Sequence, residues 1–219
     1  MIAGWKSGSH MSSSGETLPS IMSILEMTCL ENEKQYVSAV HPEGPETVTL
    51  RDGTTVTVRP IRPDDASRLQ ALFTRLSPES IFFRFLGHRK ELPYVEAEAQ
   101  ANVDYRTRMS LVATREQCRE ENVIAVTRYE VIGPGVHDVA EAAIVVEDRF
   151  QGQGLGTLLL KRLVAYARTH GIRAFQAAVY HNNAQIIRFI QCSGLPFERK
   201  RIESGVWEFR VKLEAEPAH

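Results

Sequence analysis

The sequence predicts one α/β or α+β domain in which helices pack on a mixed β-sheet. Two observations support this fold class. Apolar runs of strand length alternate with amphipathic helical segments through the second half of the chain. The chain has 219 residues, of which 43% are hydrophobic and 24% charged, so it is long enough to bury one sizeable core. One main domain with a short appendage is therefore expected.

The first 45 residues differ in composition from the rest of the chain. Residues 1–10 run into the letters GSHM, which are typical of an expression-tag remnant, and Met11 is the expected natural start. Residues 11–45 form a serine-rich extension with one stretch compatible with a short amphipathic helix, to which we assign no function. The domain itself is expected to span residues 46–214.

The first elements of the domain are a hairpin and three helices. Two β-branched runs flank Asp52-Gly53, and this dipeptide is a strong hairpin signal. Pro63, Asp64 and Asp65 predict a helix start. The helix that follows carries apolar residues on one face: Leu69, Leu72, Phe73 and Leu76. Two more helices are expected from SPESIFFRFL and PYVEAEAQAN.

The remaining elements alternate between strands and helices. Three strands are expected at Ser110–Thr114, Val123–Tyr129 and Val139–Glu147. A helix from about Gly156 to His170 ends before Gly171. The stretch AFQAAVY predicts a strand, NAQIIRFIQCSG a helix, and VWEFRVKL a last alternating strand. Helices and strands in this order predict a layered mixed sheet.

Charge and cysteine content restrict the partners and the compartment. The formal net charge is −1, so no overall basic field would attract nucleic acid or an anionic membrane. No apolar run approaches the roughly 20 residues of a membrane span. The cysteines, Cys29, Cys118 and Cys192, are far apart and fit neither a disulfide framework nor a metal site. A cytoplasmic protein without a bound metal is the expectation.

A glycine-rich turn separates the strand ending at Glu147 from the next helix. Gly152, Gly154 and Gly156 lie just before and within the expected start of that helix. The first N–H groups of a helix lack partners and lie at its positive end, so this turn is suited to an anion such as phosphate. The spacing fits neither a nucleoside triphosphate loop nor a dinucleotide-binding loop. A purely structural turn is the alternative.

The turn resembles the signature of the GNAT acyltransferases. Gln151-Gly152-Gln153-Gly154-Leu155-Gly156 reproduces the family pattern Q/R-x-x-G-x-G/A. The stretches RDGTTVTVRPIRPDDASRLQALFTRLSPESIFFRF and NVDYRTRMSLVA are similar to the GNAT domain of bacterial protein lysine acetyltransferases. The resemblance covers about residues 47–213. It implies the GNAT fold, a central, mostly antiparallel twisted mixed sheet flanked by helices, and acetyl-CoA as the co-substrate.

The resemblance also implies which residues bind acetyl-CoA. The loop amides would hold the pyrophosphate: those of Gly152, Gln153, Gly154, Leu155, Gly156 and Thr157. The main chain of Ile144 and Val146 would pair with the pantetheine arm. Asn183 would contact the pantetheine or phosphate region, although its position before a helix is equally suited to an N-cap.

Glu141 is the candidate general base. It is the charged residue within VAEAAIVV, a strand otherwise suited to burial, where loss of hydration favours the protonated form of a carboxyl group. The related protein acetyltransferases carry a glutamate at this place. The alternative is a solvent-facing or ion-paired strand residue. Glu130, Glu147 and Asp148 lie at strand ends or in the loop, where we expect solvation.

The other steps of acetyl transfer have weaker candidates. The resemblance implies that the N–H of Val146 stabilises the developing oxyanion. Many GNAT enzymes carry a tyrosine general acid where this chain has Ile190, so the thiolate is expected to leave unaided. Tyr180 and His181 are minor candidates for the site. Cys192 is expected in the core rather than as a nucleophile. Three arginines fit surface ion pairs as well as substrate docking: Arg59, Arg62 and Arg84.

Three functions remain open from the sequence. The first is direct transfer of acetyl from acetyl-CoA to a protein lysine, with an acyl-CoA synthetase as the acceptor that the resemblance implies. The second is a non-catalytic sensor that binds acyl-CoA in the same pocket. The third is acetylation of a small amine, which usually requires an acidic pocket that the sequence does not indicate.

Overall fold

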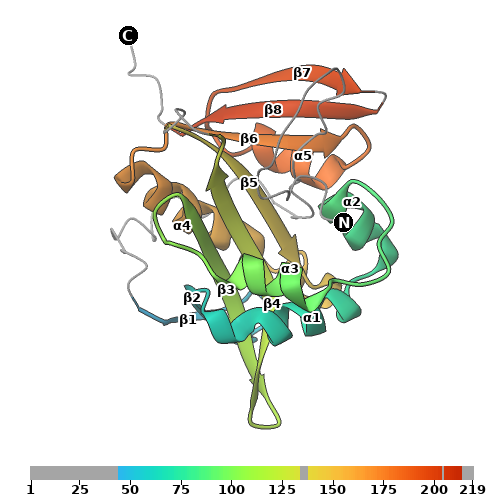
Figure 1. Ribbon diagram of the computed structural model, residues 1–219, viewed down its shortest axis with the longest axis vertical. Coiled ribbons are helices and arrows are strands. Elements are labelled where there is room, and N and C mark those ends of the chain that lie inside the picture. Colours follow the sequence, from blue (N-terminus) through green and yellow to red (C-terminus); the bar gives the residue numbers. More distant parts are fainter. Residues whose placement is uncertain (1–43, 134–137, 204, 214–219) are drawn as a thin grey trace.

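The computed structural model describes residues 44–133, 138–203 and 205–213. An eight-stranded sheet has the order β1-β2-β3-β4-β5-β6-β8-β7 (Figure 1). Its strands are β1 Glu46–Thr49, β2 Thr55–Pro60, β3 Arg108–Gln117, β4 Glu120–Val131, β5 Val139–Val146, β6 Ala174–Tyr180, β7 Phe197–Glu203 and β8 Val206–Lys212. Neighbouring strands are antiparallel except β5 and β6, which are parallel. The predicted mixed, mostly antiparallel sheet is therefore confirmed.

Helices cover both faces of the sheet. They are α1 Ala66–Arg75, α2 Pro78–Phe85, α3 Tyr94–Ala101, α4 Leu155–Thr169 and α5 Ala184–Gln191. Leu69, Leu72 and Phe73 of α1 pack with Val126 of β4 and Val145 of β5 in one core cluster. The apolar residues of α4 and α5 pack on the other face, where they contact Ala140, Ala142, Ile144 and Val146 of β5. Alternate residues of β5 thus serve two different cores.

The expected start of the domain is confirmed in most details. β1 and β2 form the predicted hairpin around Asp52-Gly53, and Gly53 has φ +85°, a left-handed conformation that favours glycine. Pro63–Asp65 form a short 3-10 helix ahead of α1. Ser77 caps α2 by accepting a hydrogen bond from the N–H of Ser80 (3.1 Å). Residues 1–43, with most of the predicted tag and extension, lie outside the described residues.

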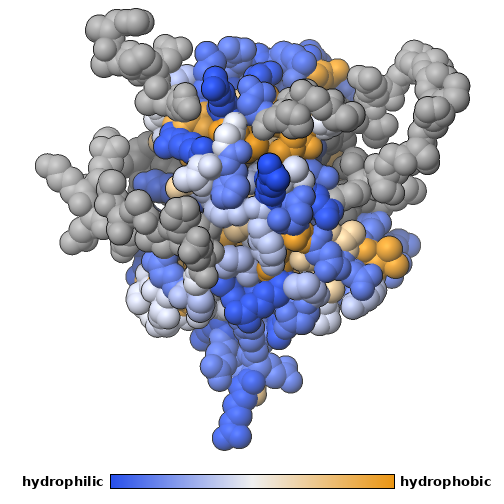
Figure 2. All heavy atoms as spheres, turned by 60° about the vertical axis from the view of Figure 1, so that its left-hand side comes forward, coloured by the Kyte–Doolittle hydropathy of each residue, from blue (hydrophilic) through white to orange (hydrophobic). Residues whose placement is uncertain are grey.

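Two features of the sheet differ from the prediction. β7 was not predicted, because its sequence FERKRIE is mostly charged; it is an exposed edge strand that pairs only with β8 among the described strands. β3 and β4 also extend beyond Ser110–Thr114 and Val123–Tyr129 into a long hairpin. The end of this hairpin projects from the domain (Figure 1) and its surface is hydrophilic (Figure 2). Its polar residues gave no apolar alternation by which to predict a strand.

Candidate active site

β5 and β6 separate in the middle of the sheet. The register pairs the two strands only over Val139–Glu141 and Ala174–Gln176, within the described residues. Beyond these three pairs the strands diverge (Figure 1). A parallel pair that opens in this way exposes one edge of β5 to a ligand that can pair as an added strand. Ile144 and Val146, whose main chain is expected to pair with the pantetheine arm, lie on the unpaired part of this edge.

The main chain of Ile144 and Val146 points into this opening. The N–H of Glu147 donates to the C=O of Ile124 (2.8 Å), and Val146 lies opposite Ala125 in the β4–β5 register. In an antiparallel ladder this pattern makes the Val146 pair one whose own N–H and C=O groups face away from the partner strand. Ile144, two residues earlier, has the same orientation. Both residues direct their main-chain groups toward the β6 side.

The glycine-rich turn leads directly into α4. Gly152 and Gly154 have φ values of +74° and +85°, which residues other than glycine adopt at a cost. The N–H of Leu158 makes the first intrahelical bond, to Gly154 C=O (3.1 Å), so the amides of residues 155–157 precede the helical ladder. The hydroxyl of Thr157 is buried and has no hydrogen-bond partner within the described residues. These donors suit an anion at the start of α4.

Arg51 lies beside the same turn, which sequence reasoning missed. Its N–H approaches the C=O of Gln153 (3.5 Å), and its Nε is 3.7 Å from the place that a Cβ on Gly154 would occupy. This position in the β1–β2 loop is distant in sequence, and only the folded hairpin brings it to α4. The guanidinium adds a full positive charge to the positive end of the helix.

Gln151, the first residue of the glycine motif, ties the turn to the strand before it. Its Nε2 donates to the C=O of Val146 (3.1 Å) and to Oγ of Ser80 in α2 (3.4 Å). The sequence analysis used Gln151 only to recognise the motif and gave it no role. Its contacts explain a glutamine here, because the side chain must span from the end of β5 to α2.

Asn183 caps α5. Its Oδ1 accepts a hydrogen bond from the N–H of Ile186 (3.2 Å), and the residue is buried. The capping alternative is therefore confirmed, and a contact with the pantetheine remains a prediction. Ile190, which occupies the place of the usual tyrosine acid, is buried in the core between the sheet and the helices α4 and α5.

Glu141 lies on the α2 face of β5, half-buried and among charged groups. It is directly opposite Glu130 on β4, and Arg128, two residues before Glu130, donates to that neighbour (3.1 Å). Burial lowers the pKa of the Arg84 guanidinium on α2 to about 9, aided by Arg128, whereas the charge of Glu141 opposes the change. Glu141 is thus in electrostatic range of two buried arginines.

Glu130 is not the freely solvated residue that we expected. Burial raises the pKa of its carboxyl group, and the charge of Glu141 adds to this, although Arg128 and Arg108 oppose it. The two glutamates form a cross-strand pair of like charges, an arrangement that is unfavourable without compensation. The neighbouring guanidiniums supply that compensation.

Glu147 and Asp148 were also wrongly expected to be solvated. Glu147 is 3% exposed and forms ion pairs with Arg75 of α1 (2.9 Å) and with Arg149. Both oxygens of Asp148 accept hydrogen bonds from the start of α2. Apart from Arg149, their partners lie about 70 residues earlier in the chain, so the strand-end position alone could not reveal them.

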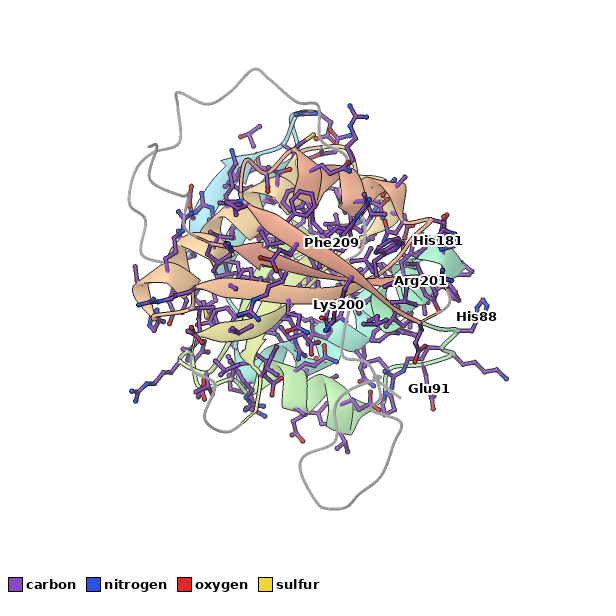
Figure 3. All side chains as sticks on the ribbon, turned by 90° about the horizontal axis from the view of Figure 1, so that it is seen from above. His88, Glu91, His181, Lys200, Arg201 and Phe209 are labelled. Carbon is purple, nitrogen blue, oxygen red and sulfur yellow. The ribbon has the colours of Figure 1, made fainter. Side chains whose placement is uncertain are left out.

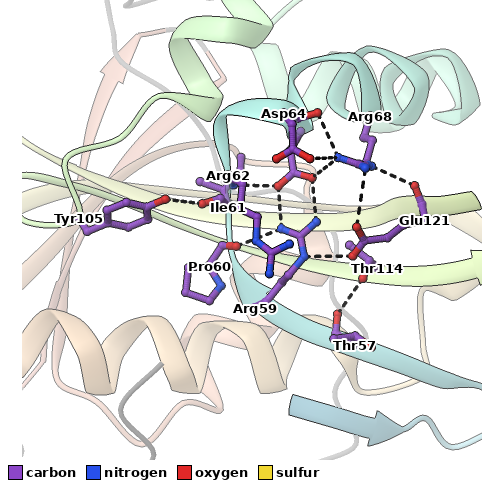
Figure 4. Close-up of polar contacts among 11 residues, drawn as sticks. Thr57, Arg59, Pro60, Ile61, Arg62, Asp64, Arg68, Tyr105, Thr114 and Glu121 are labelled. Carbon is purple, nitrogen blue, oxygen red and sulfur yellow. Dashed lines mark hydrogen bonds and ion pairs between the residues drawn. The ribbon is translucent and has the colours of Figure 1, made fainter. Parts of the chain in front are cut away.

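The expected surface arginines are partly buried. Arg59 is 3% exposed and makes a bidentate ion pair with Asp65 (2.7 and 2.8 Å), joined by Glu121 (Figure 4). Arg84 is 2% exposed. Arg62 alone of the three is exposed. Arg59 therefore fixes β2 to the start of α1 and serves the fold.

The remaining candidates are placed as follows. Tyr180 stacks on Phe82 of α2 with ring centres 4.7 Å apart, and its hydroxyl donates to the C=O of Leu86 (3.3 Å). His181 is exposed at the rim (Figure 3), with Nδ1 3.0 Å from the C=O of Gly205. Cys192 is half-buried rather than in the core. In the described ranges no acidic, histidine and cysteine side chains cluster as a metal site would require.

Comparison with known proteins identifies the family. The pattern of the acetyltransferase (GNAT) family matches residues 75–194. The chain belongs to the GNAT acetyltransferase family. It is 31% identical to an acetyltransferase of Pseudomonas aeruginosa over 148 residues, which cover 67% of this chain and 78% of that protein. This GNAT protein is accordingly an N-acetyltransferase, and the family supports acetyl-CoA as its acetyl donor.

Two further relatives carry related names. The crystal structure of the GNAT domain of S. lividans PAT superposes with a TM-score of 0.67 at 35% identity, covering 77% of this chain and 96% of that one. Acetyltransferase Pat of Mycolicibacterium smegmatis is 29% identical over 71% of this chain. The match spans only 46% of the mycobacterial protein, so the activity of that whole protein does not carry over directly. No helix in the described part of this acetyltransferase could cross a membrane.

Proposed function

We propose that the protein transfers the acetyl group of acetyl-CoA directly to a lysine side chain of a protein, within a ternary complex. The observation that carries this proposal is the opening between β5 and β6. It lies between the glycine turn at one end of β5 and Glu141 toward the other end. Donor and acceptor can therefore meet on one strand.

Acetyl-CoA supplies the acetyl group, and main-chain groups hold it. The amides at the start of α4 and the hydroxyl of Thr157 suit the pyrophosphate. The ligands in this proposal are Gly152, Gln153, Gly154, Leu155, Gly156 and Thr157. The inward-facing main chain of Ile144 and Val146 suits the amide groups of pantetheine. Asn183 completes the set at the start of α5.

Glu141 is the general base in this proposal. A lysine amine attacks only when neutral, and its pKa in water is about 10.4, so a proton must be removed. The N–H of Val146 stabilises the negative charge that develops on the carbonyl oxygen. Because Ile190 cannot donate a proton, the CoA thiolate leaves without a side-chain acid.

A protein acceptor is favoured over a small polycationic amine by the charges around Glu141. Two buried guanidiniums, Arg84 and Arg128, offset the charges of Glu130 and Glu141, so these residues do not form the acidic pocket that a polyamine or aminoglycoside usually requires. A single lysine on a folded protein carries one charge and brings its own docking surface. The similarity to proteins named PAT and Pat supports the same choice. Our first candidate for the acceptor is an acyl-CoA synthetase.

The proposal is tested by incubating the protein with isotope-labelled acetyl-CoA and an extract of its own cell, then mapping acetylated lysines by mass spectrometry. Purified acyl-CoA synthetase, free lysine, spermidine and an aminoglycoside serve as separate acceptors. We expect labelled protein lysines and little turnover of the small amines. Efficient turnover of a small amine, with no acetylated protein, would show that the acceptor is a small amine rather than a protein lysine. Binding of acetyl-CoA without transfer to any acceptor would favour the sensor.

A further inference from the structure

The segment between β5 and the glycine turn is hydrogen-bonded to the first turn of α2. Asp148 Oδ2 accepts from the N–H of Ser77 (2.8 Å), and Oδ1 is 2.6 and 2.7 Å from the hydroxyls of Ser77 and Ser80. Gln151 Nε2 is 3.4 Å from the same Ser80 oxygen and also donates to Val146 C=O. A continuous chain of hydrogen bonds thus links the end of β5, the turn and α2.

This network is charged and partly buried. Burial raises the pKa of Asp148, but hydrogen bonds from the hydroxyl and N–H of Ser77 and from Ser80 outweigh it and hold the pKa below its usual value. The carboxylate stays ionised at neutral pH at the positive end of α2. Ser80 is fully buried, so its hydroxyl depends on these partners. Charge-assisted bonds of this kind are stronger than neutral ones.

The rest of α2 lies over the proposed reaction site. Arg84, near its C-terminal end, is buried within electrostatic range of Glu141. Phe82 stacks on Tyr180 at the end of β6 (4.7 Å). The helix has eight residues, which corresponds to about 12 Å. A short rigid helix therefore connects the glycine turn with the groups around Glu141.

We propose that Asp148 and Ser80 are positioning residues that couple occupancy of the glycine turn to the position of α2. The inference rests on the proposed function, because it takes the turn as the cofactor-phosphate site. An anion bound by the turn restricts the motion of residues 151–157. The hydrogen bonds from Gln151 to Ser80 and from α2 to Asp148 then restrict the motion of α2 as well. Donor binding then restrains Arg84 and Phe82 more firmly in the positions around Glu141 and Tyr180 that the structure shows. Neither positioning residue needs to touch the reacting atoms.

The test measures coupling rather than activity. CoA is the probe, its affinity is measured by calorimetry, and amide hydrogen exchange of α2 is followed with and without it. In the wild type, CoA should slow exchange of the amides of residues 79–85 at least about fivefold, the lower end of typical coupling between two sites. Ser80→Ala should keep CoA affinity within about tenfold, because the loop amides remain, yet lose most of this protection.

Two further variants make the result unambiguous. Asp148→Asn should behave like Ser80→Ala, because it removes the negative charge and leaves a single amide oxygen for the three donors of Ser77 and Ser80. Thr74→Ala removes a hydroxyl that bonds only within α1, to Ala71 C=O (2.9 Å), and should match the wild type. A merely structural role would raise exchange equally with and without CoA, whereas lost coupling abolishes the difference between the two states.

The outcomes separate the inference from the proposed function. Equal CoA-dependent protection of α2 in the wild type and in Ser80→Ala overturns the coupling, and so does CoA binding to the wild type without any protection of α2. If Ser80→Ala does not fold, the same comparison on Asp148→Asn decides. A wild-type protein that does not bind CoA at all would instead overturn the proposed function.

Discussion

The two faces of the sheet handle charge in opposite ways. On the face toward α4 and α5, β5 presents only Ala140, Ala142, Ile144 and Val146, and leucines of α4 cover them. The face toward α1, α2 and α3 holds the buried charged residues of the described part: Arg59, Asp65, Arg84, Arg128 and Glu147. The same strand, β5, therefore borders an uncharged core and a charged one.

In the proposed function, the two faces of the sheet serve different steps of acetyl transfer. Binding a phosphate at the start of α4 needs N–H groups, which every residue but proline supplies, so the adjacent core can stay apolar. Removing a proton from an amine needs a titratable side chain, which in the proposal is Glu141. A half-buried carboxylate opposite Glu130 needs positive charges nearby to offset the repulsion between the two. The charged face supplies them, with buried ion pairs that cost desolvation.

The largest expected effect is on catalysis at the charged face. Glu141→Gln should lower kcat by about 10² to 10⁴, the range for loss of a general base, while CoA affinity stays unchanged. Glu130→Gln is the matched control, because it makes the same change directly across the β4–β5 ladder. It should lower kcat less than about tenfold. Steady-state kinetics with the identified acceptor measure both, and equal losses would show that the pair acts without a distinct base.

The next effect is on stability, again at the charged face. Asp65→Asn should cost about 3–5 kcal/mol in the free energy of unfolding, because it removes the buried, bidentate partner of Arg59 and leaves only the partly exposed Glu121. Burial raises the pKa of Asp65, but hydrogen bonds from Arg59 and the Arg62 N–H outweigh it, so the folded-state pKa lies below the unfolded value. The stabilisation is complete above about pH 5 and declines as the pH falls below about 4.

Urea unfolding of wild type and Asp65→Asn at several pH values checks this prediction. The difference in stability between the two proteins should be constant near neutral pH and should narrow in acid. A difference that does not depend on pH would mean that Asp65 acts through packing alone, and the contrast between the faces would then lose its electrostatic basis.

A core substitution on the apolar face should be destabilising without this pH dependence. Leu159 of α4 is fully buried, so Leu159→Ala should cost about 2–5 kcal/mol through lost burial and a cavity. No buried charge lies on that side within the described residues, so the cost should be the same at pH 4 and pH 7. The same unfolding series measures it, with Asp65→Asn as the reference.

The smallest effect tests the main-chain site at the glycine turn. Gly154→Ala and Gly154→Glu share the backbone strain of φ +85°, so their difference reports the added side chain and its charge. The glutamate can reach Arg51 and take the place of a phosphate. We expect it to weaken CoA affinity at least about tenfold more than alanine, or about 1.4 kcal/mol, by calorimetry. Equal affinities would reduce the loop to a structural turn.

Local sequence signals predicted much of the fold and the position of the glycine turn. The hairpin at Asp52-Gly53, the apolar face of α1 and the glycine turn each depend on residues close together in the chain. The main-chain ligands proposed for acetyl-CoA rest on the resemblance to the GNAT family and remain a prediction. Glu141 could be singled out as a charge within an apolar strand.

The contacts that arise only on folding could not be predicted. Glu147 and Asp148 look like ordinary strand-end acids, and their burial depends on Arg75 and Ser77 from a distant segment. Arg84 lies in a helix of mixed composition, and its position beneath the sheet face depends on how α2 docks. β7 has the composition of a solvated loop, yet the neighbouring β8 provides a ladder for it.

The short β5–β6 ladder divides the protein into two mechanical units. β6, β8 and β7 are paired extensively with one another but joined to β5 by three residue pairs. Residues 174–213 are thus suited to open as one cooperative unit at a lower free energy than global unfolding. A ligand that lies along β5 in the opening would contact both units and stabilise the short β5–β6 ladder between them. Acetyl-CoA should then protect amides of β6 and β8 from hydrogen exchange, including those of residues that it does not contact. Without acetyl-CoA, proteases should cleave the protein most readily near the β5–β6 ladder.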